Sequence, residues 1–253
     1  MGRSGTCGTS DAHHIHGREP AHRTVRPLFK ARVFPACGGG GAGGDGARLD
    51  ACHGEGPRPL ASPPGQEGGH AIAAVLTGEA EPTGRLVTTY PEADGATPAW
   101  NVTPGDDFGL DYTDGTAIGY RGYHAGHAPA PLYWFGHGLG YGSWEYGAAR
   151  LAPQGDAAEA PTVEAELTNT SARPSRETVQ VYFAPADSAQ PVRLAGYTGV
   201  DVPAGASVTV TVACDRRLFC RWDEAAHAWA SLTGGELLVA RGLGDIRAQV
   251  PLS

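Results

Sequence analysis

Lysine is almost absent from this 253-residue sequence: Lys30 is the only one, and every other residue in the Lys+Arg total of 19 is arginine. Acidic residues outnumber them at 27, which gives a formal net charge of −8. An acidic chain is repelled by phosphate backbones and by anionic lipid surfaces. We therefore expect neither nucleic acid nor a membrane surface as a partner.

Long apolar stretches are missing as well. No apolar run in the sequence approaches the roughly 20 residues that a helix needs to cross a bilayer. The N-terminus also lacks the apolar core of a secretory signal. We therefore expect no membrane-spanning segment and, by default, a cytoplasmic protein, with the compartment itself left open.

Cysteine is too scarce for a disulfide framework, since the whole chain has five. Cys214 and Cys220 are the only two that fall within one plausible domain. They form either a bridge or, in the simpler interpretation, two inert thiols.

The first 64 residues differ in composition from the rest of the chain. Glycine and proline are frequent there, and the apolar residues follow neither a helical nor an alternating period. The run Gly38 to Gly44, which is glycine except at Ala42, is too flexible to be ordered cheaply. Residues 1–64 are therefore either a disordered tail or, as we favour, an out-of-frame translation of GC-rich DNA that joins a real reading frame near Gly65.

Residues 65–157 mix one helical pattern with turns. Apolar residues on one face predict a short helix over residues 70–77, which Gly78 ends. Residues 82–85 form a turn, residues 86–90 a strand candidate, and residues 91–118 a long loop.

Residues 158–253 are dominated by alternation of apolar and polar side chains. The apolar members of the clearest examples are Val163, Ala165 and Leu167; Val179, Val181 and Phe183; Val208, Val210 and Val212; and Ile246, Ala248 and Val250. Several short strands separated by turn residues over about 100 residues indicate a β-sandwich of the immunoglobulin or fibronectin type III kind.

An ordered series of short motifs runs from about residue 65 to residue 253. Its members are Gly65 to Gly69 with Ala71 to Leu76, Pro82 to Leu86, Gly119 to Tyr123, Phe135 to Tyr141, Glu177 to Tyr182, Leu194 to Tyr197, Pro203 to Gly205, and Trp222 with Asp223. This series resembles the C-terminal region of glycoside hydrolase family 3, the β-glucosidase and β-xylosidase family. The resemblance implies that residues 65–157 are the end of an α/β sandwich domain plus a linker, and that residues 158–253 are a fibronectin type III-like domain. The expected fold is thus mainly β, with a remnant of an α/β domain in front of the sandwich and a disordered tail before that.

The family's retaining chemistry uses two carboxylates about 5 Å apart. The resemblance implies that the nucleophile and the acid/base residue both come from segments upstream of anything matched here. We therefore assign no catalytic residue, cofactor site or metal site. The chain is interpreted as a C-terminal accessory fragment of a β-glucosidase-type enzyme that is inactive alone. The alternatives are a stand-alone carbohydrate-binding module and a structural module that docks onto the missing catalytic domains.

The shortened α/β piece has a physical consequence of its own. Ile72, Val75 and Leu76 lack the sheet that such a helix covers, and each large apolar side chain left in water forfeits roughly 1.5–3 kcal/mol. We expect this segment to be loosely held, to fold back on the sandwich, or to drive self-association through exposed apolar surface.

Four other groups of residues each have a functional and a structural interpretation. Asp106, Asp107, Asp111 and Asp114 are either a calcium site or, as we favour, a solvated acidic loop. Tyr120, Tyr133, Trp134, Tyr141 and Trp144 form either a sugar-stacking platform or a packed junction between domains, and we favour the junction. His137 is expected to be a buried hydrogen-bonding residue rather than a general base, and His13, His14 and His16 complete no zinc pattern.

Overall fold

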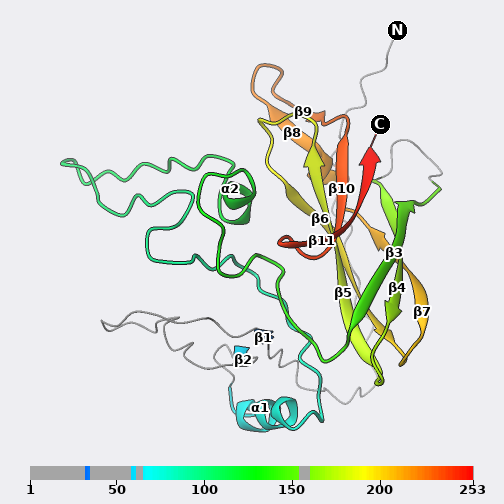
Figure 1. Cartoon of the computed structure of the whole chain (residues 1–253). Coiled ribbons are helices and arrows are strands. Elements are labelled where there is room, and N and C mark those ends of the chain that lie inside the picture. The colour runs from blue at the N-terminus through cyan, green and yellow to red at the C-terminus, as the bar shows by residue number, and fades with distance from the viewer. Residues whose placement is uncertain (1–31, 35–57, 61–64, 154–159, 253) are drawn as a thin grey trace, which may run out of the picture.

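The computed structural model describes residues 32–34, 58–60, 65–153 and 160–252 (Figure 1). Within the N-terminal zone it shows strand β1 (Arg32–Phe34) paired antiparallel with strand β2 (Arg58–Leu60). The remainder of residues 1–64, including the glycine run and the three histidines, lies outside the described residues. The expectation of a disordered or out-of-frame tail therefore stays a prediction.

Two antiparallel sheets form the body of the protein, as the alternating pattern predicted. One sheet has the strand order β11-β10-β5-β6 and the other has the order β3-β4-β7. The strand bounds are β3 (Trp144–Leu151), β4 (Thr162–Asn169), β5 (Ser175–Pro185), β6 (Arg193–Val202), β7 (Ser207–Ala213), β10 (Gly235–Gly242) and β11 (Asp245–Leu252). A separate hairpin of β8 (Cys220–Asp223) and β9 (Ala228–Ser231) follows a short 3₁₀ helix, η2 (Arg216–Phe219).

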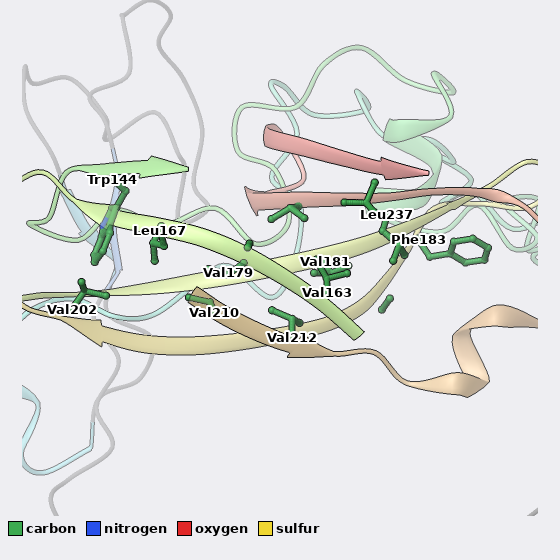
Figure 2. Close-up of a cluster of buried hydrophobic side chains, with 14 residues drawn as sticks. Trp144, Val163, Leu167, Val179, Val181, Phe183, Val202, Val210, Val212 and Leu237 are labelled. Carbon is green, nitrogen blue, oxygen red and sulfur yellow. The ribbon is translucent and has the colours of Figure 1, made fainter. Parts of the chain in front are cut away.

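The hydrophobic core fills the space between the two sheets (Figure 2). Val179, Val181 and Phe183 of β5 face Val163 and Val212 of the opposite sheet, and all five are completely buried. Because side chains alternate between the faces of a strand, every second residue of β4, β5 and β7 enters this core. The alternation read from the sequence is therefore the direct cause of the sandwich.

Strand β5 departs from simple alternation because both of its faces are covered. Gln180 and Tyr182 on its outer face are as buried as the core valines. The covering segment contains helix α2 (Tyr120–His124) and residues 132–136, which lie over the four-stranded sheet. In a sheet that is covered on both faces, nearly every residue of a strand is buried. In β5 every residue from Glu177 to Phe183 is buried except Thr178.

Local differences from the sequence predictions have physical reasons. The sandwich begins at β3, upstream of residue 158, because a register shift between Tyr146 and Ala149 interrupts the alternation that would reveal this strand. The strand candidate at residues 86–90 forms only one bridge, between Tyr90 and Tyr133, so that prediction is wrong. Helix α1 (Gly68–Leu76) forms close to where the periodicity placed it.

The two candidate cysteines are not bridged to each other. Cys214 carries a free thiol, whereas Cys220 is disulfide-bonded. Burial raises the pKa of the Cys214 thiol to about 11, so this thiol stays protonated near neutral pH. The interpretation as two inert thiols is therefore right for Cys214 and wrong for Cys220.

Among the described residues, no helix is both long enough and apolar enough to span a bilayer.

Candidate functional site at the junction of the linker and the sandwich

Residues 77–143, here called the linker, connect helix α1 to the first strand of the sandwich. Helix α1 lies beyond the end of the sandwich at which β5 begins (Figure 1). The Tyr141 hydroxyl donates a hydrogen bond to the carbonyl of Val75, and Arg173 donates to the carbonyl of Gly78 at 3.2 Å. The helix is thus held against the sandwich, although Leu76 stays exposed. The segment was expected to be loosely held, to fold back on the sandwich or to self-associate. The contacts of Tyr141 and Arg173 with α1 and the residues after it correspond to folding back on the sandwich.

Glu81 fastens the linker to the start of β5. Its Oε1 accepts hydrogen bonds from the backbone N–H of Tyr141 at 2.8 Å and from the hydroxyl of Ser175. Its Oε2 accepts from the backbone N–H of Arg176 at 2.8 Å. Gly140 makes this approach possible, because a Cβ there would lie 2.5 Å from Glu81 Oε1. Hydrogen bonds to a charged acceptor are roughly twice as strong as neutral ones, so Glu81 is the main polar anchor at this end.

A buried ionic triad joins the linker to two strands. Glu177 of β5 accepts from Arg85 Nη2 at 2.6 Å through Oε1 and from Arg241 Nε of β10 at 2.8 Å through Oε2. The Glu177 side chain is 0% exposed, and the two arginines are nearly buried. The backbone N–H of Thr178 also donates to Oε1. Glu177 shares its strand face with Val179, so its carboxylate lies on the side of β5 that faces the hydrophobic core.

An aromatic layer covers the outer face of the four-stranded sheet. The rings of Tyr120 and Phe135 stack with their centroids 4.6 Å apart, and both meet Tyr182 of β5 edge to face. The Tyr120 hydroxyl accepts a hydrogen bond from the backbone N–H of Leu194 at 3.1 Å. This arrangement has both the ring geometry and the polar partner that buried tyrosines require.

All five aromatic residues considered as a sugar platform are used for packing. Tyr120 and Trp134 belong to the layer over the sheet, and Tyr133 is buried against Leu86. Trp144 lies in the sandwich core, and Tyr141 packs under Arg173 with its hydroxyl bonded to α1. Packing is therefore confirmed for all five, and the junction itself holds Tyr120, Trp134 and Tyr141, whereas Trp144 belongs to the sandwich core.

His137 lies inside the junction, with its ring stacked on Tyr133 at a centroid distance of 5.3 Å. Burial lowers the pKa of this imidazole, and the charges of Arg85 and Arg241 lower it further, while Asp245 opposes them. A neutral imidazole stacked on an aromatic ring suits a packing role better than that of a general base working near its ordinary pKa.

The acidic loop is built from turn contacts. Asp107 accepts a hydrogen bond from the backbone N–H of Gly109 at 2.9 Å, and Asn101 donates to the carbonyl of Asp111 at 2.8 Å. Within residues 65–153 and 160–252, no group of three or more His, Cys, Asp or Glu side chains is placed to hold a metal ion.

An open groove of about 490 Å³ lies between the outer face of β5–β6 and the linker. Arg176, Thr178 and Gln180 of β5 form its floor together with Tyr197 and Gly199 of β6. The linker supplies the walls, of which Thr83, Arg85, Leu86, Val87, Phe135 and Gly136 are part. Strict alternation would place Tyr197 on the same face as the buried Ala195. The register shift of β6 at Ala195 instead puts Tyr197 on the outer face, opposite Gln180, and no sequence pattern reveals this shift.

Two protein-family models match this chain. The glycosyl hydrolase family 3 C-terminal domain matches residues 60–141, and the fibronectin type III-like domain matches residues 177–241. The junction described above is therefore the boundary between these two matched regions.

Relatives and solved structures of glycosidases are similar to this chain as well. The chain is 38% identical over 181 residues to the exo-α-(1→6)-L-arabinopyranosidase of Bifidobacterium breve, covering 70% of this chain and 23% of that enzyme. It is 34% identical over 197 residues to a β-glucosidase of Rhizobium radiobacter, covering 75% of this chain and 24% of that enzyme. The crystal structure of DesR, a β-glucosidase from Streptomyces venezuelae, superimposes with a TM-score of 0.68 at 32% identity, covering 75% of this chain and 25% of DesR.

The chain therefore spans about a quarter of the length of these relatives. This chain belongs to glycosyl hydrolase family 3, where it corresponds to the C-terminal portion that carries the family's C-terminal domain region and its fibronectin type III-like domain.

Proposed function

We propose that this chain is the accessory C-terminal part of a β-glucosidase-type glycoside hydrolase acting in carbohydrate metabolism, and that it does not hydrolyse glycosides by itself. The accessory role is supported by how much of each chain aligns. The alignment covers 70% of this chain and only 23% of an arabinopyranosidase relative. Its role in that case is to hold the end of the α/β domain in place through the Glu81 anchor and the Glu177 triad.

The chemistry of the junction supports the absence of hydrolysis. A retaining glycosidase needs two carboxyl groups about 5–5.5 Å apart that are free to face one sugar. Both oxygens of Glu81 accept hydrogen bonds from the protein, and both oxygens of Glu177 are bound by arginine. Neither junction carboxylate is available as a nucleophile or as a proton donor to a leaving group.

The test is release of p-nitrophenol from aryl β-glucosides, β-xylosides and α-L-arabinopyranosides by the purified chain. We expect rates equal to buffer. A family 3 β-glucosidase of full length, assayed in parallel, shows that the conditions support turnover. Turnover well above buffer that co-purifies with the chain through two columns and is absent from a mock purification would contradict the proposal.

We further propose that a second surface contacts the domains that precede the matched region in the relatives. The linker segment before α2 reaches away from the sandwich (Figure 1). Along it Trp100, Val102, Phe108 and Tyr112 are exposed, and Phe108 and Tyr112 are each 90% exposed. Phe108 also adopts a left-handed backbone with φ of 59°, held by the turn in which its N–H donates to Gly105. A strained, fully exposed aromatic side chain of this kind is typical of a contact surface.

This partner is tested with the isolated N-terminal three-quarters of the Bifidobacterium breve relative. We expect it to bind the chain in isothermal titration calorimetry, and the triple variant Trp100→Ser, Phe108→Ser, Tyr112→Ser to lose that binding while keeping its circular dichroism spectrum. Light scattering on the chain alone gives the alternative result: a concentration-dependent dimer that the triple variant abolishes would assign this surface to self-association instead.

A further inference from the structure

We propose that the groove over β5 and β6 binds one sugar unit of a neutral saccharide, with Tyr197 as the stacking ring. The groove has the volume of an ordinary small-ligand site, about 490 Å³ against a usual range of roughly 300–1,000 Å³. Arg85 of the triad and Phe135 of the aromatic layer border the groove, while Thr178, Tyr197 and Gly199 belong to neither. The proposed binding does not depend on whether the chain hydrolyses glycosides.

The register of β5 and β6 places the groove residues side by side. Gln180 pairs with Tyr197, Thr178 pairs with Gly199, and Arg176 pairs with Asp201. These pairs share the outer face of the sheet, because side chains on paired strands alternate in step. Gly199 has no side chain, and Arg176 Nη2 donates to its carbonyl at 3.3 Å across the space that a Cβ would fill. The Arg176 guanidinium therefore lies over Gly199, two residues along β6 from Tyr197.

Tyr197 is the one aromatic ring of this floor that remains in water. Its side chain is 68% exposed, whereas Phe135 at the back of the groove is packed against Tyr182. A tyrosine ring offers an apolar face together with a hydroxyl that can donate and accept a hydrogen bond. The apolar C–H face of a pyranose can stack on the tyrosine ring, and the sugar hydroxyls can form hydrogen bonds with the tyrosine hydroxyl.

The charges of the groove favour a neutral ligand over an anion. Arg85 is paired with Glu177 at 2.6 Å, and Arg176 is paired with Asp201. Each guanidinium that faces the groove therefore already has a carboxylate partner, so a phosphate would have to displace one. The hydroxyls of Thr83, Thr178 and Tyr197 remain as the polar groups suited to a ligand with many hydroxyls.

The groove exists only when the linker is docked. Thr83, Arg85 and Val87 come from the linker, and Thr178 and Tyr197 come from the sandwich. A ligand that contacts both sides binds the docked arrangement and not the undocked one, so it stabilises the junction by mass action. Saccharide binding and protection of the linker from amide exchange are therefore expected to rise together.

The experiment titrates the ¹⁵N-labelled chain with cellobiose, xylobiose and methyl β-glucoside, followed by amide chemical shifts. We expect saturable shifts at Thr178, Tyr197 and Gly199 with affinity in about the millimolar range. Tyr197→Ala should weaken binding by about fivefold, the worth of one aromatic contact. The matched control is Tyr112→Ala, which removes an even more exposed tyrosine outside the groove and should leave the affinity unchanged.

Several outcomes would overturn the assignment. These are the lack of saturable shifts with every saccharide, equal affinity in Tyr197→Ala, or shifts centred on the exposed Trp222 and Trp229 pair of the β8–β9 hairpin. Inorganic phosphate that binds the groove more tightly than the saccharides would show that the ligand class is wrong. Hydrolysis would appear in the same tubes as new anomeric signals, and it would contradict the proposed function without touching this assignment.

Discussion

Arg85 and Glu177 lie 92 residues apart in the sequence, and their side chains meet at 2.6 Å in the interior of the junction. The first belongs to the linker that follows α1 and the second to an inner strand of the four-stranded sheet. Arg241 binds the other oxygen of Glu177, so one carboxylate joins the linker, β5 and β10. The two matched domains of this chain are thus linked by a buried charge network as well as by apolar packing.

Glu177→Gln should be the most damaging conservative substitution in the junction. It leaves two nearly buried guanidinium groups without a carboxylate, and loss of one partner of a buried ion network costs about 3 kcal/mol or more. We expect that loss in the free energy of urea unfolding, followed by tryptophan fluorescence.

Glu164→Gln is the control for this change. Glu164 pairs with Arg150 at 2.6 Å on the surface, and exposed ion pairs contribute roughly 0–1 kcal/mol. Equal losses in the two variants would show that the triad does not carry the junction's stability.

Leu86→Ala tests the apolar side of the same junction. Leu86 is 1% exposed and packs against Tyr133, so truncation should cost about 2–5 kcal/mol through lost burial and the cavity left behind. Its neighbour Val87 is 74% exposed, and Val87→Ala should change stability by less than about 0.5 kcal/mol. Thermal unfolding of both variants checks this, and similar midpoints would contradict the docked position of the linker.

Glu81→Gln should loosen helix α1 without unfolding the sandwich. An amide nitrogen cannot accept the hydrogen bond that Oε2 accepts from Arg176, and a hydrogen bond to a charged group is worth about 1.5–3 kcal/mol. Amide exchange across residues 70–90 should therefore accelerate by about tenfold or more. Exposed Glu79→Gln should leave exchange unchanged, and simultaneous acceleration in the core of β5 would mean that the junction and the sandwich open as one unit.

Stability should fall when the pH drops below neutral, and His137 should contribute to the fall. Burial, with help from Arg85 and Arg241, lowers its pKa from the ordinary 6.5. The unfolded chain then binds this proton more readily, so the contribution is complete above pH 6.5 and is lost as the pH falls through the folded-state value. His124, whose pKa burial also lowers, acts in the same direction.

The measurement is the urea midpoint between about pH 7 and about pH 5. His137→Gln should reduce the slope of stability against pH without removing it, because His124 remains. A slope that the substitution leaves unchanged would contradict the neutral state of His137.

Local pattern was enough to predict most of the sandwich and the helix. The apolar residues of β4, β5 and β7 alternate because one face of each strand lies in the core, and such a period is visible without knowing the partner strand. Strand β3 escaped because its register shift breaks the period at Tyr146. The family motifs could also be recognised without a structure, because each is a short sequence segment and their order follows the chain.

The contents of the junction were decided by tertiary structure. Nothing near Arg85 in the sequence indicates that Glu177 and Arg241 will surround it, and nothing near Tyr197 indicates that Gly199 and Thr178 will form a floor beside it. These contacts join segments brought together only after the sheets have paired, so no local period encodes them. The sequence alone therefore determined most of the strands and the family, whereas the burial of Glu177 and the exposure of Tyr197 follow from how the linker folds over β5 and β6.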